Sequence, residues 1–312
     1  MPCFSPLNAY RSPEGVSFSM AGAYSADAKI KLPCGRCIGC RLEHSRQWAA
    51  RMMHEASLYD YNCFVTLTYD NQHLPNNGSL KKRDVQLFLK RLRKKYGPKI
   101  RFYCAGEYGE RDQRPHYHLC LFNHYFHDAV PWKRTEQGHT LYRSAALERL
   151  WTAGHSSLNE LTFESAAYAA RYILKKVKGG ECTRVLADEN GRYRPVVHEY
   201  ATMSRGGRSG CGIAGDWIVR YRSDVYDGDT QDFIVVNGVK CKPPRFYDET
   251  VRRLEDNERE SSNTVPLLSG MDRTKLDRVR RGKGNEWNNT RDRLRVRETV
   301  LRSKISTLKR GL

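Results

Sequence analysis

The most constraining feature of the sequence is a pair of histidines that flank one tyrosine inside an apolar stretch, residues 115–122. Successive side chains of a β-strand point to opposite faces of a sheet. A strand over this stretch therefore places His116 and His118 on one face, together with Cys120 and Phe122. Standing alone, such a histidine pair is more often structural than metal-binding, but here it predicts two imidazoles that face the same way.

The hairpin that contains the histidines predicts a carboxylate beside them. Residues 99–105 alternate as a strand does, and a polar loop joins this strand to the histidines. Glu107 closes the first strand, so it can lie beside the histidines across the hairpin. It is our first choice for a third metal ligand, and Glu110 is the alternative. Oxygen and imidazole ligands favour Mn²⁺ or Mg²⁺, and the two nitrogens favour Mn²⁺.

A second pattern, over residues 164–177, predicts a helix that ends at two glycines. Tyr168 and Tyr172 are four residues apart, so they share a face of this helix, with Cβ atoms about 5–6 Å apart. Lys175 falls on the same stripe, and Lys176 lies a little off it. The helix therefore presents two phenols and a cation together.

These residue types match one kind of chemistry. Breaking a phosphodiester through a covalent intermediate needs a nucleophile, a Lewis acid on the phosphate and a positive charge for the developing oxyanion. A free tyrosine has a pKa of about 10, so it attacks well only when a nearby cation favours the phenolate. Lys175 is placed for that. With two tyrosines, one can hold a cut 5′ end while the other makes a second cut, without ATP.

Charge points to the same class of partner. The chain has 312 residues and a formal net charge of +19, which favours a polyanionic partner, nucleic acid first and an acidic membrane surface second. The sequence contains no run of about 18 apolar residues and no layout typical of a secretion signal. We therefore expect a soluble, intracellular protein with no membrane partner.

Three of the ten cysteines are closely spaced. Cys34, Cys37 and Cys40 have the spacing of metal ligands, but a tetrahedral zinc site needs a fourth group. Cys3 and His44 are the nearest candidates for that group. A cluster of redox-inert thiols remains the alternative, since a chain without an export signal is expected to keep its thiols reduced.

The patterns divide the chain into four segments. Residues 1–33 look irregular, a helix is expected from about residue 42 to 58, and Ser79 is a plausible N-cap for a later helix. The expected segments are a cysteine-containing N-terminal segment with a helix, a catalytic core, a hairpin-rich extension and a basic, partly disordered tail, over residues 1–60, 61–180, 181–248 and 249–312 respectively.

The histidine strand followed by the tyrosine helix resembles the HUH endonuclease superfamily, which starts rolling-circle replication. Further segments are similar to the replication initiators of gokushovirus-type microviruses, which are small single-stranded DNA phages. The resemblance covers roughly residues 30–250. Besides the histidines and tyrosines, it is carried by Cys34–Arg41, Phe64–Tyr69, Gly106–Glu110, Arg114–His116, Met203–Arg205 and Val236–Tyr247.

The resemblance implies an α+β fold, in which helices flank an antiparallel sheet and the histidines lie on a central strand. It also implies a nicking and joining enzyme that cuts one strand of duplex replicative-form DNA at an origin. Such an enzyme stays on the 5′ phosphate through Tyr168 or Tyr172 and later ligates the displaced single strand. A host helicase and polymerase would then be partners, in the bacterial cytoplasm, because the chain has no Walker motif.

Two other functions compete with this one. An HUH transposase or plasmid relaxase would use the same cleavage chemistry on a hairpin or a transfer origin. A non-catalytic, zinc-containing packaging factor would need only the positive charge. Substitution of both histidines separates these classes, since it abolishes cleavage by an enzyme but leaves salt-sensitive DNA binding.

Overall fold

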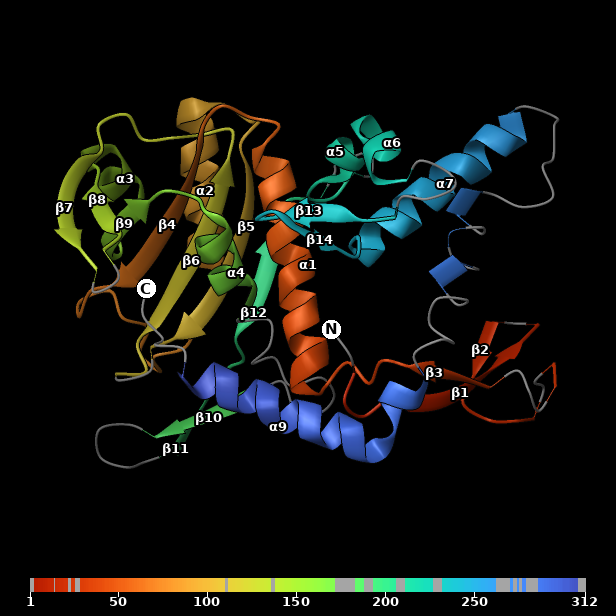
Figure 1. Ribbon diagram of the computed structural model, residues 1–312. Coiled ribbons are helices and arrows are strands. Elements are labelled where there is room, and N and C mark those ends of the chain that lie inside the picture. The colour runs from red at the N-terminus through yellow and green to blue at the C-terminus, as the bar shows by residue number, and fades with distance from the viewer. Residues whose placement is uncertain are drawn as a thin grey trace. The chain divides into compact units, whose positions relative to one another are not determined.

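The computed structural model divides the chain into two units (Figure 1). The smaller unit contains Met1–His44 and Asp277–Arg310, and the larger unit contains Ser45–Leu276 and Gly311–Leu312. The structure describes residues 3–13, 15–21, 24–25, 29–109, 112–135, 138–171, 183–187, 193–205, 211–226, 232–261, 270–271, 274, 277–278 and 286–307.

The larger unit is built on a seven-stranded sheet with the order β12-β5-β6-β4-β9-β8-β7, in which all neighbours are antiparallel. The histidine strand, β6, lies between β5 and β4, so the expected central position is confirmed. The expected α+β class, with an antiparallel sheet and several helices, is also confirmed. The strands are β4 (Asn62–Tyr69), β5 (Arg101–Tyr108), β6 (Pro115–Phe122), β7 (Val130–Arg134), β8 (Thr140–Arg143), β9 (Gly154–Asn159) and β12 (Tyr200–Met203).

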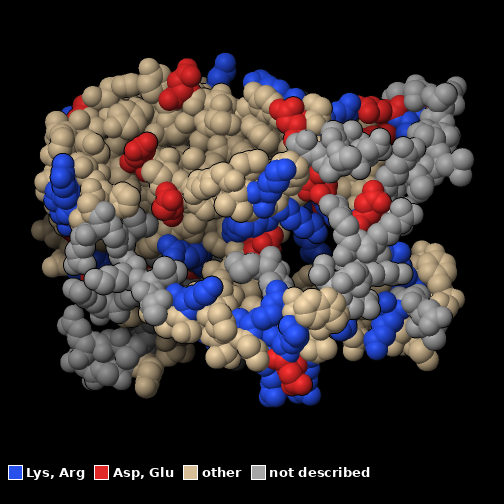
Figure 2. All heavy atoms as spheres, viewed as in Figure 1, with Lys and Arg blue, Asp and Glu red and all other residues tan. Residues whose placement is uncertain are grey.

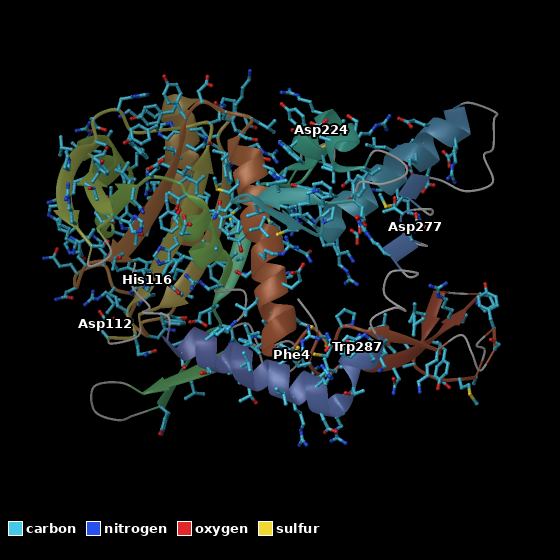
Figure 3. All side chains as sticks on the ribbon, viewed as in Figure 1. Phe4, Asp112, His116, Asp224, Asp277 and Trp287 are labelled. Atoms are coloured by element: carbon cyan, nitrogen blue, oxygen red, sulfur yellow. The ribbon has the colours of Figure 1, made fainter. Side chains whose placement is uncertain are left out.

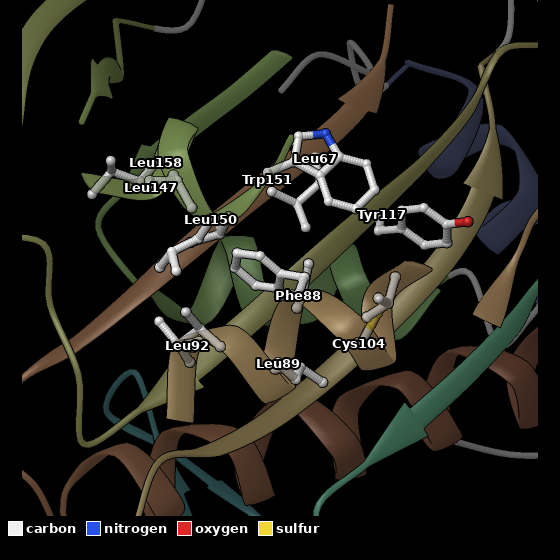
Figure 4. Close-up of a cluster of buried hydrophobic side chains, with 14 of the residues drawn as sticks. Leu67, Phe88, Leu89, Leu92, Cys104, Tyr117, Leu147, Leu150, Trp151 and Leu158 are labelled. Atoms are coloured by element: carbon white, nitrogen blue, oxygen red, sulfur yellow. The ribbon is translucent and has the colours of Figure 1, made fainter. Parts of the chain in front are cut away.

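One face of the sheet is covered by α2 (Lys82–Tyr96) and α3 (Ala145–Leu150). Figure 4 shows Phe88, Leu89 and Leu92 of α2 packed among side chains of this face. Phe88 is fully buried, and truncating such a side chain to alanine costs about 3–5 kcal/mol. This cluster covers one face of the sheet, and the histidines lie on the opposite face.

The opposite face, which carries the histidines, is covered by two helices. They are α4 (Phe163–Arg171) and the part of α1 (Ile38–Ala56) that belongs to this unit. Both helices meet the sheet through small side chains, which include Ala49 of α1 and Ala166 of α4, both fully buried. Small contact residues let a helix approach a sheet closely, and Figure 1 shows α4 lying over β6.

One expected helix start is wrong. Ser79 does not cap α2, which begins at Lys82 after Lys81, without a side-chain cap. The Ser79 hydroxyl instead accepts a hydrogen bond from the Val197 amide at 2.9 Å. A bond between residues 118 positions apart leaves no local signal in the sequence, so the capping pattern was misleading.

A third hydrophobic cluster of the larger unit packs against α1. Arg51 of α1 stacks between the rings of Trp48 and Phe246, with its guanidinium carbon 4.1 and 3.8 Å from their centroids. The hairpin expected near residue 237 is present, and its turn has the positive φ angles of Asn237 and Gly238, 48° and 75°. The remaining elements of this unit are β10 (Thr183–Ala187), β11 (Tyr193–Val197), α5 (Gly215–Arg220), α6 (Arg222–Val225), β13 (Ile234–Val236), β14 (Val239–Cys241) and α7 (Arg245–Ser261).

The smaller unit contains a three-stranded antiparallel sheet with the order β2-β1-β3. The expectation that residues 1–33 are irregular is therefore wrong. The strands are β1 (Leu7–Ser12), β2 (Gly15–Ser17) and β3 (Lys29–Leu32). They are short and mostly exposed, so their sequences lack the alternation of apolar and polar residues that predicts a strand.

The C-terminal part of the smaller unit holds a short 3₁₀ helix (Glu286–Asn289) and α9 (Arg291–Thr307). Six of the residues in α9 are basic and described as exposed or half-buried, and Figure 2 shows Lys and Arg side chains gathered along it. The expected domain boundaries stay predictions. Within the described residues, no helix is both long and apolar enough to cross a membrane.

His54 makes the stability of the larger unit pH-dependent. It stacks on Trp217 at a centroid distance of 3.7 Å, and its Nδ1 lies 2.7 Å from the Tyr247 hydroxyl. Burial lowers the pKa of His54 to about 4, whereas an unfolded histidine has a pKa of about 6.5. Between these values the unfolded chain binds one more proton, so stability is complete above about pH 6.5 and falls as the pH falls.

We predict that His54→Gln flattens this dependence. The free energy of unfolding of the wild-type chain should change by up to about 1.4 kcal/mol per pH unit more than that of the variant between pH 4 and 6.5. Urea titrations across this range measure both slopes. Burial also lowers the pKa of His124 to about 4, but this residue contributes equally to both proteins. Equal slopes would contradict the assignment to His54.

Candidate functional site

The register of β5 and β6 brings one carboxylate and two imidazoles together. Glu107 is the cross-strand partner of His116, and Ala105 is the partner of His118. One oxygen of the carboxylate, Glu107 Oε1, lies 2.7 Å from the Nε2 atoms of both histidines. These three residues form a group that can hold a metal ion. Figure 3 shows His116 on the sheet of the larger unit.

A second set of contacts orients both imidazole rings. His116 Nδ1 lies 3.1 Å from the carbonyl oxygen of Arg114, which only accepts, so this nitrogen carries a proton. His118 Nδ1 lies 3.1 Å from the hydroxyl oxygen of Thr66 on β4. Outer contacts of this kind fix the ring orientation of metal-binding histidines and leave Nε2 for the metal.

The surroundings of Glu107 fit a cation. The side chain is 2% exposed, and its second oxygen, Oε2, has no hydrogen-bond partner among the described residues. A buried anionic oxygen without a partner is costly. A divalent ion would bind the carboxylate and both Nε2 atoms, and such a two-histidine, one-carboxylate set leaves coordination positions open for other ligands.

The charges of the three groups depend on one another. Burial lowers the pKa of His116, but its hydrogen bond to Glu107 and the charge of that carboxylate outweigh burial, so the pKa is raised overall. Burial dominates for His118, whose pKa is lowered. Burial acts to raise the pKa of Glu107, but the hydrogen bonds from both histidines outweigh it and lower the pKa. The carboxylate is therefore ionised at neutral pH.

Helix α4 places a tyrosine against this group. The ring of Tyr168 lies edge-on to the ring of His118, with centroids 5.0 Å apart and planes at 85°. The start of the helix is fixed by a reciprocal pair, in which the Thr162 amide donates to Ser165 Oγ and the Ser165 amide donates to Thr162 Oγ1. This pair stands where a capping box stands.

The structure brings together some of the predicted residues but not all. Glu107, His116, His118 and Tyr168 are together, whereas the other candidates lie outside the described residues. These are Glu110, Tyr172, Lys175 and Lys176.

Arg171 is a residue that the sequence pattern did not single out. Its guanidinium carbon lies 5.5 Å from the centroid of the Tyr168 ring. The two residues are three apart on a helix, and this spacing was the available signal. A cation near a phenol favours the phenolate.

The cysteines of the smaller unit also converge. The sulfur atoms of Cys3, Cys34, Cys37 and Cys40 all lie within 4.8 Å of one another, so Cys3 and not His44 supplies the fourth group. Figure 3 shows Phe4 beside sulfur atoms of this cluster.

Backbone amides surround these sulfur atoms. The Cys34 amide donates to Cys3 Sγ at 3.2 Å, and the Phe4 amide donates to Cys37 Sγ at 3.3 Å. Burial acts to raise the pKa of the Cys34 thiol, but the amides of Cys37 and Arg36 favour the thiolate and lower the pKa to about 7. The Cys34 sulfur therefore favours the thiolate, the form that binds metal, whereas burial raises the pKa of the Cys3 and Cys40 thiols.

Comparison with known proteins shows to which family the chain belongs. A family model described as replication-associated protein ORF2/G2P matches residues 62–177, the segment that holds the candidate metal ligands and Tyr168. The replication-associated protein VP4 of Bdellovibrio phage phiMH2K is 31% identical over 263 residues, which cover 81% of this chain and 78% of the relative. The chain belongs to the replication-associated proteins of the microviruses.

Other members of this family are similar over most of the chain. The replication-associated protein ORF2 of Spiroplasma virus 4 is 28% identical over 274 residues, which cover 81% of each protein. The replication-associated protein ORF4 of Chlamydia phage 1 is 30% identical over 245 residues, which cover 73% of this chain and 55% of the relative. No solved structure matches this replication-associated protein significantly.

We predict that Glu107→Gln loses divalent metal binding and that Glu110→Gln keeps it. Changes to the outer contacts of a metal site alone cost about 10- to 100-fold in affinity, so removal of a ligand should cost at least as much. Isothermal titration with Mn²⁺ measures both variants. Wild-type affinity in Glu107→Gln together with loss in Glu110→Gln would make Glu110 the ligand.

Proposed function

We propose that this microvirus replication-associated protein initiates rolling-circle replication by nicking one strand at the viral origin. The observation that carries the proposal is the contact between Tyr168 and His118, because it puts a phenol beside a group suited to a metal. The Tyr168 oxygen attacks the scissile phosphorus as the bond from phosphorus to the 3′ oxygen breaks. The products are a 5′-phosphotyrosyl linkage and a 3′ oxygen that takes up one proton to become a hydroxyl.

The residues of the chain have separate parts in this step. Glu107, His116 and His118 would hold Mn²⁺ or Mg²⁺, which as a Lewis acid would polarise the phosphate. The two nitrogen ligands favour Mn²⁺. Arg171, and Lys175 and Lys176 beyond it, supply positive charge that favours the Tyr168 phenolate and the developing oxyanion.

A second tyrosine completes the cycle. Tyr172 follows Tyr168 by four residues, which is one helical turn. While one tyrosine holds the 5′ phosphate, the other makes the second cut. The free 3′-hydroxyl then attacks the first phosphotyrosyl bond, releases the tyrosine and closes the displaced single strand into a circle. Each cut stores the energy of the next joining step, so no ATP is used.

The partners follow from the substrate. Single-stranded DNA and the duplex replicative form are the polyanions that a net charge of +19 favours. The names of the relatives concern replication, which supports an origin as the substrate rather than a transposon end or a transfer origin. A host helicase and a host polymerase would open and copy the duplex in the bacterial cytoplasm.

We also propose that the four cysteines bind a structural Zn²⁺. Four thiolates complete a tetrahedral zinc site without an open position. Support comes from the convergence of Cys3 with the other three, since residues 31 positions apart in the chain meet with amide donors already turned to the sulfur atoms. The zinc would join the N-terminal sheet to the start of α1 within the smaller unit.

Substitution of both histidines tests the enzymatic proposal. We predict that His116→Ala with His118→Ala abolishes cleavage of an origin oligonucleotide but leaves salt-sensitive DNA binding within about threefold of the wild type, because the basic residues remain. Gel assays of cleavage and fluorescence anisotropy measure the two. Parallel loss of binding would favour a non-catalytic DNA-binding factor.

The tyrosines are tested separately. Tyr168→Phe or Tyr172→Phe should lower the yield of covalent protein–DNA adduct without erasing it, because each residue can act as nucleophile. The double variant should form none. Denaturing gels with a labelled oligonucleotide give the yields. If one single variant already forms no adduct, shared use of the tyrosines is wrong.

The zinc proposal is tested by metal content. The purified chain should contain about one zinc ion, and Cys3→Ser should lose most of it. Cys241→Ser is the matched control, because this half-buried free cysteine lies outside the cluster. Inductively coupled plasma mass spectrometry gives the content. A wild-type chain without zinc, or equal zinc in both variants, would contradict the zinc proposal and favour a cluster of redox-inert thiols.

A further inference from the structure

The polar face of the sheet continues beyond the candidate metal ligands. Glu107 pairs with His116, His116 pairs with Thr68, and Thr68 pairs with His155. Partners in an antiparallel sheet point to the same face, so these four residues form one row across β5, β6, β4 and β9. We call them the polar row. His155 is exposed and lies two strand spacings from His116, or about 10 Å.

A pocket of about 560 Å³ lies at the far end of the polar row. It is lined by Thr68, Tyr69, Asp70, Asn71, Gln72, Arg114 and His155. Thr68 and His155 also belong to the polar row, and the carbonyl oxygen of Arg114 contacts His116, a candidate metal ligand. The pocket therefore lies beside the candidate metal ligands, although none of them lines it.

Arg114 is held in position by the chain end of β4. Its guanidinium donates to the Tyr69 carbonyl at 3.0 Å and to Asn71 Oδ1 at 2.6 Å. A guanidinium has five N–H donors in one plane, so these two bonds fix the plane and, with Nε 3.7 Å from the Asp112 carboxylate, still leave donors for a ligand. A positioned guanidinium is the side chain best suited to grip a phosphate.

The other groups of the pocket match a base. The Gln72 amide can both donate to and accept from base edges, and the Asn71 amide, whose oxygen accepts from Arg114, offers its NH₂ group as a donor. Asp70 accepts from the backbone and ring nitrogens of His73, and its carboxylate disfavours a bare phosphate in the pocket while accepting from a base amino group. Arginine, imidazole, amides and a carboxylate together fit a whole nucleotide better than a free phosphate.

We propose that this pocket binds one nucleotide of the origin strand, next to the scissile phosphate. Arg114 and His155 hold its phosphate, and Asn71 and Gln72 read its base. The proposal rests on the proposed nicking function and gives that function a specificity pocket. Arg114 lines the pocket, and its carbonyl oxygen contacts His116. A nucleotide bound in the pocket would therefore set which phosphate lies beside the candidate metal ligands.

The test measures base preference in binding, without cleavage. Single-stranded oligonucleotides tiled across the origin region of the chain's own genome are bound in EDTA and followed by fluorescence anisotropy. The tightest one is then substituted base by base. The wild-type chain should discriminate at one or two adjacent positions by about tenfold or more.

Pocket variants should remove this preference. Asn71→Ala with Gln72→Ala should equalise the four bases at that position and, because Asn71 Oδ1 also holds Arg114, should weaken binding of every base there. Arg114→Lys and His155→Ala should weaken binding of all bases there. Gln86→Ala, an exposed amide on α2 across the sheet, is the matched control and should behave as the wild type.

The outcomes separate this proposal from the nicking proposal. His116→Ala with His118→Ala should keep the base preference, since the pocket remains. Base preference that depends on Asn71 and Gln72, in a chain that never forms a covalent adduct, would support the pocket and refute nicking. If adducts form but the Asn71→Ala/Gln72→Ala variant keeps the base preference, the pocket proposal is refuted. The same holds if adducts form and the wild type shows no base preference.

Discussion

The candidate site depends on one carboxylate oxygen that contacts two imidazoles on a buried face of a sheet. Glu107 Oε1 can reach both histidines only because β5 and β6 pair with Glu107 opposite His116. A slip of one residue in β6 would turn both imidazoles to the other face of the sheet. There they would meet the apolar cluster around Phe88 and Leu119. The register of this hairpin therefore decides whether these three groups can meet and hold a metal ion.

The same constraint explains the helix above the histidines. A helix with bulky contact residues would stand farther from the sheet, whereas Ala166, Ala169 and Ala170 of α4 are fully buried against it. The ring of Tyr168 can then lie edge-on against the ring of His118. The charged end of the helix, at Arg171, stays exposed near the phenol.

Local patterns in the sequence predicted the parts of the site that are close in the chain. The two-residue period placed both histidines on one face, the hairpin placed Glu107, and helical spacing placed Tyr168 on one face of its helix. The position of His155 could not be predicted, and the sequence could not decide between Cys3 and His44, because His155 and Cys3 each reach their site from a distant segment. β9 pairs with β4 across 85 or more residues, and Cys3 meets Cys34 through the fold of the smaller unit. Non-local pairing of short strands carries no signature in composition or period.

The central claim is that Tyr168, or Tyr172 four residues further along the chain, attacks DNA beside the candidate metal ligands. The most direct measurement digests the covalent product formed with Mn²⁺ and an origin oligonucleotide, and identifies the DNA-linked peptide by mass spectrometry. The account predicts a 5′-phosphate linked to Tyr168 or Tyr172. A linkage to any other residue, or no linked peptide from a chain that binds both Mn²⁺ and the oligonucleotide, would contradict it.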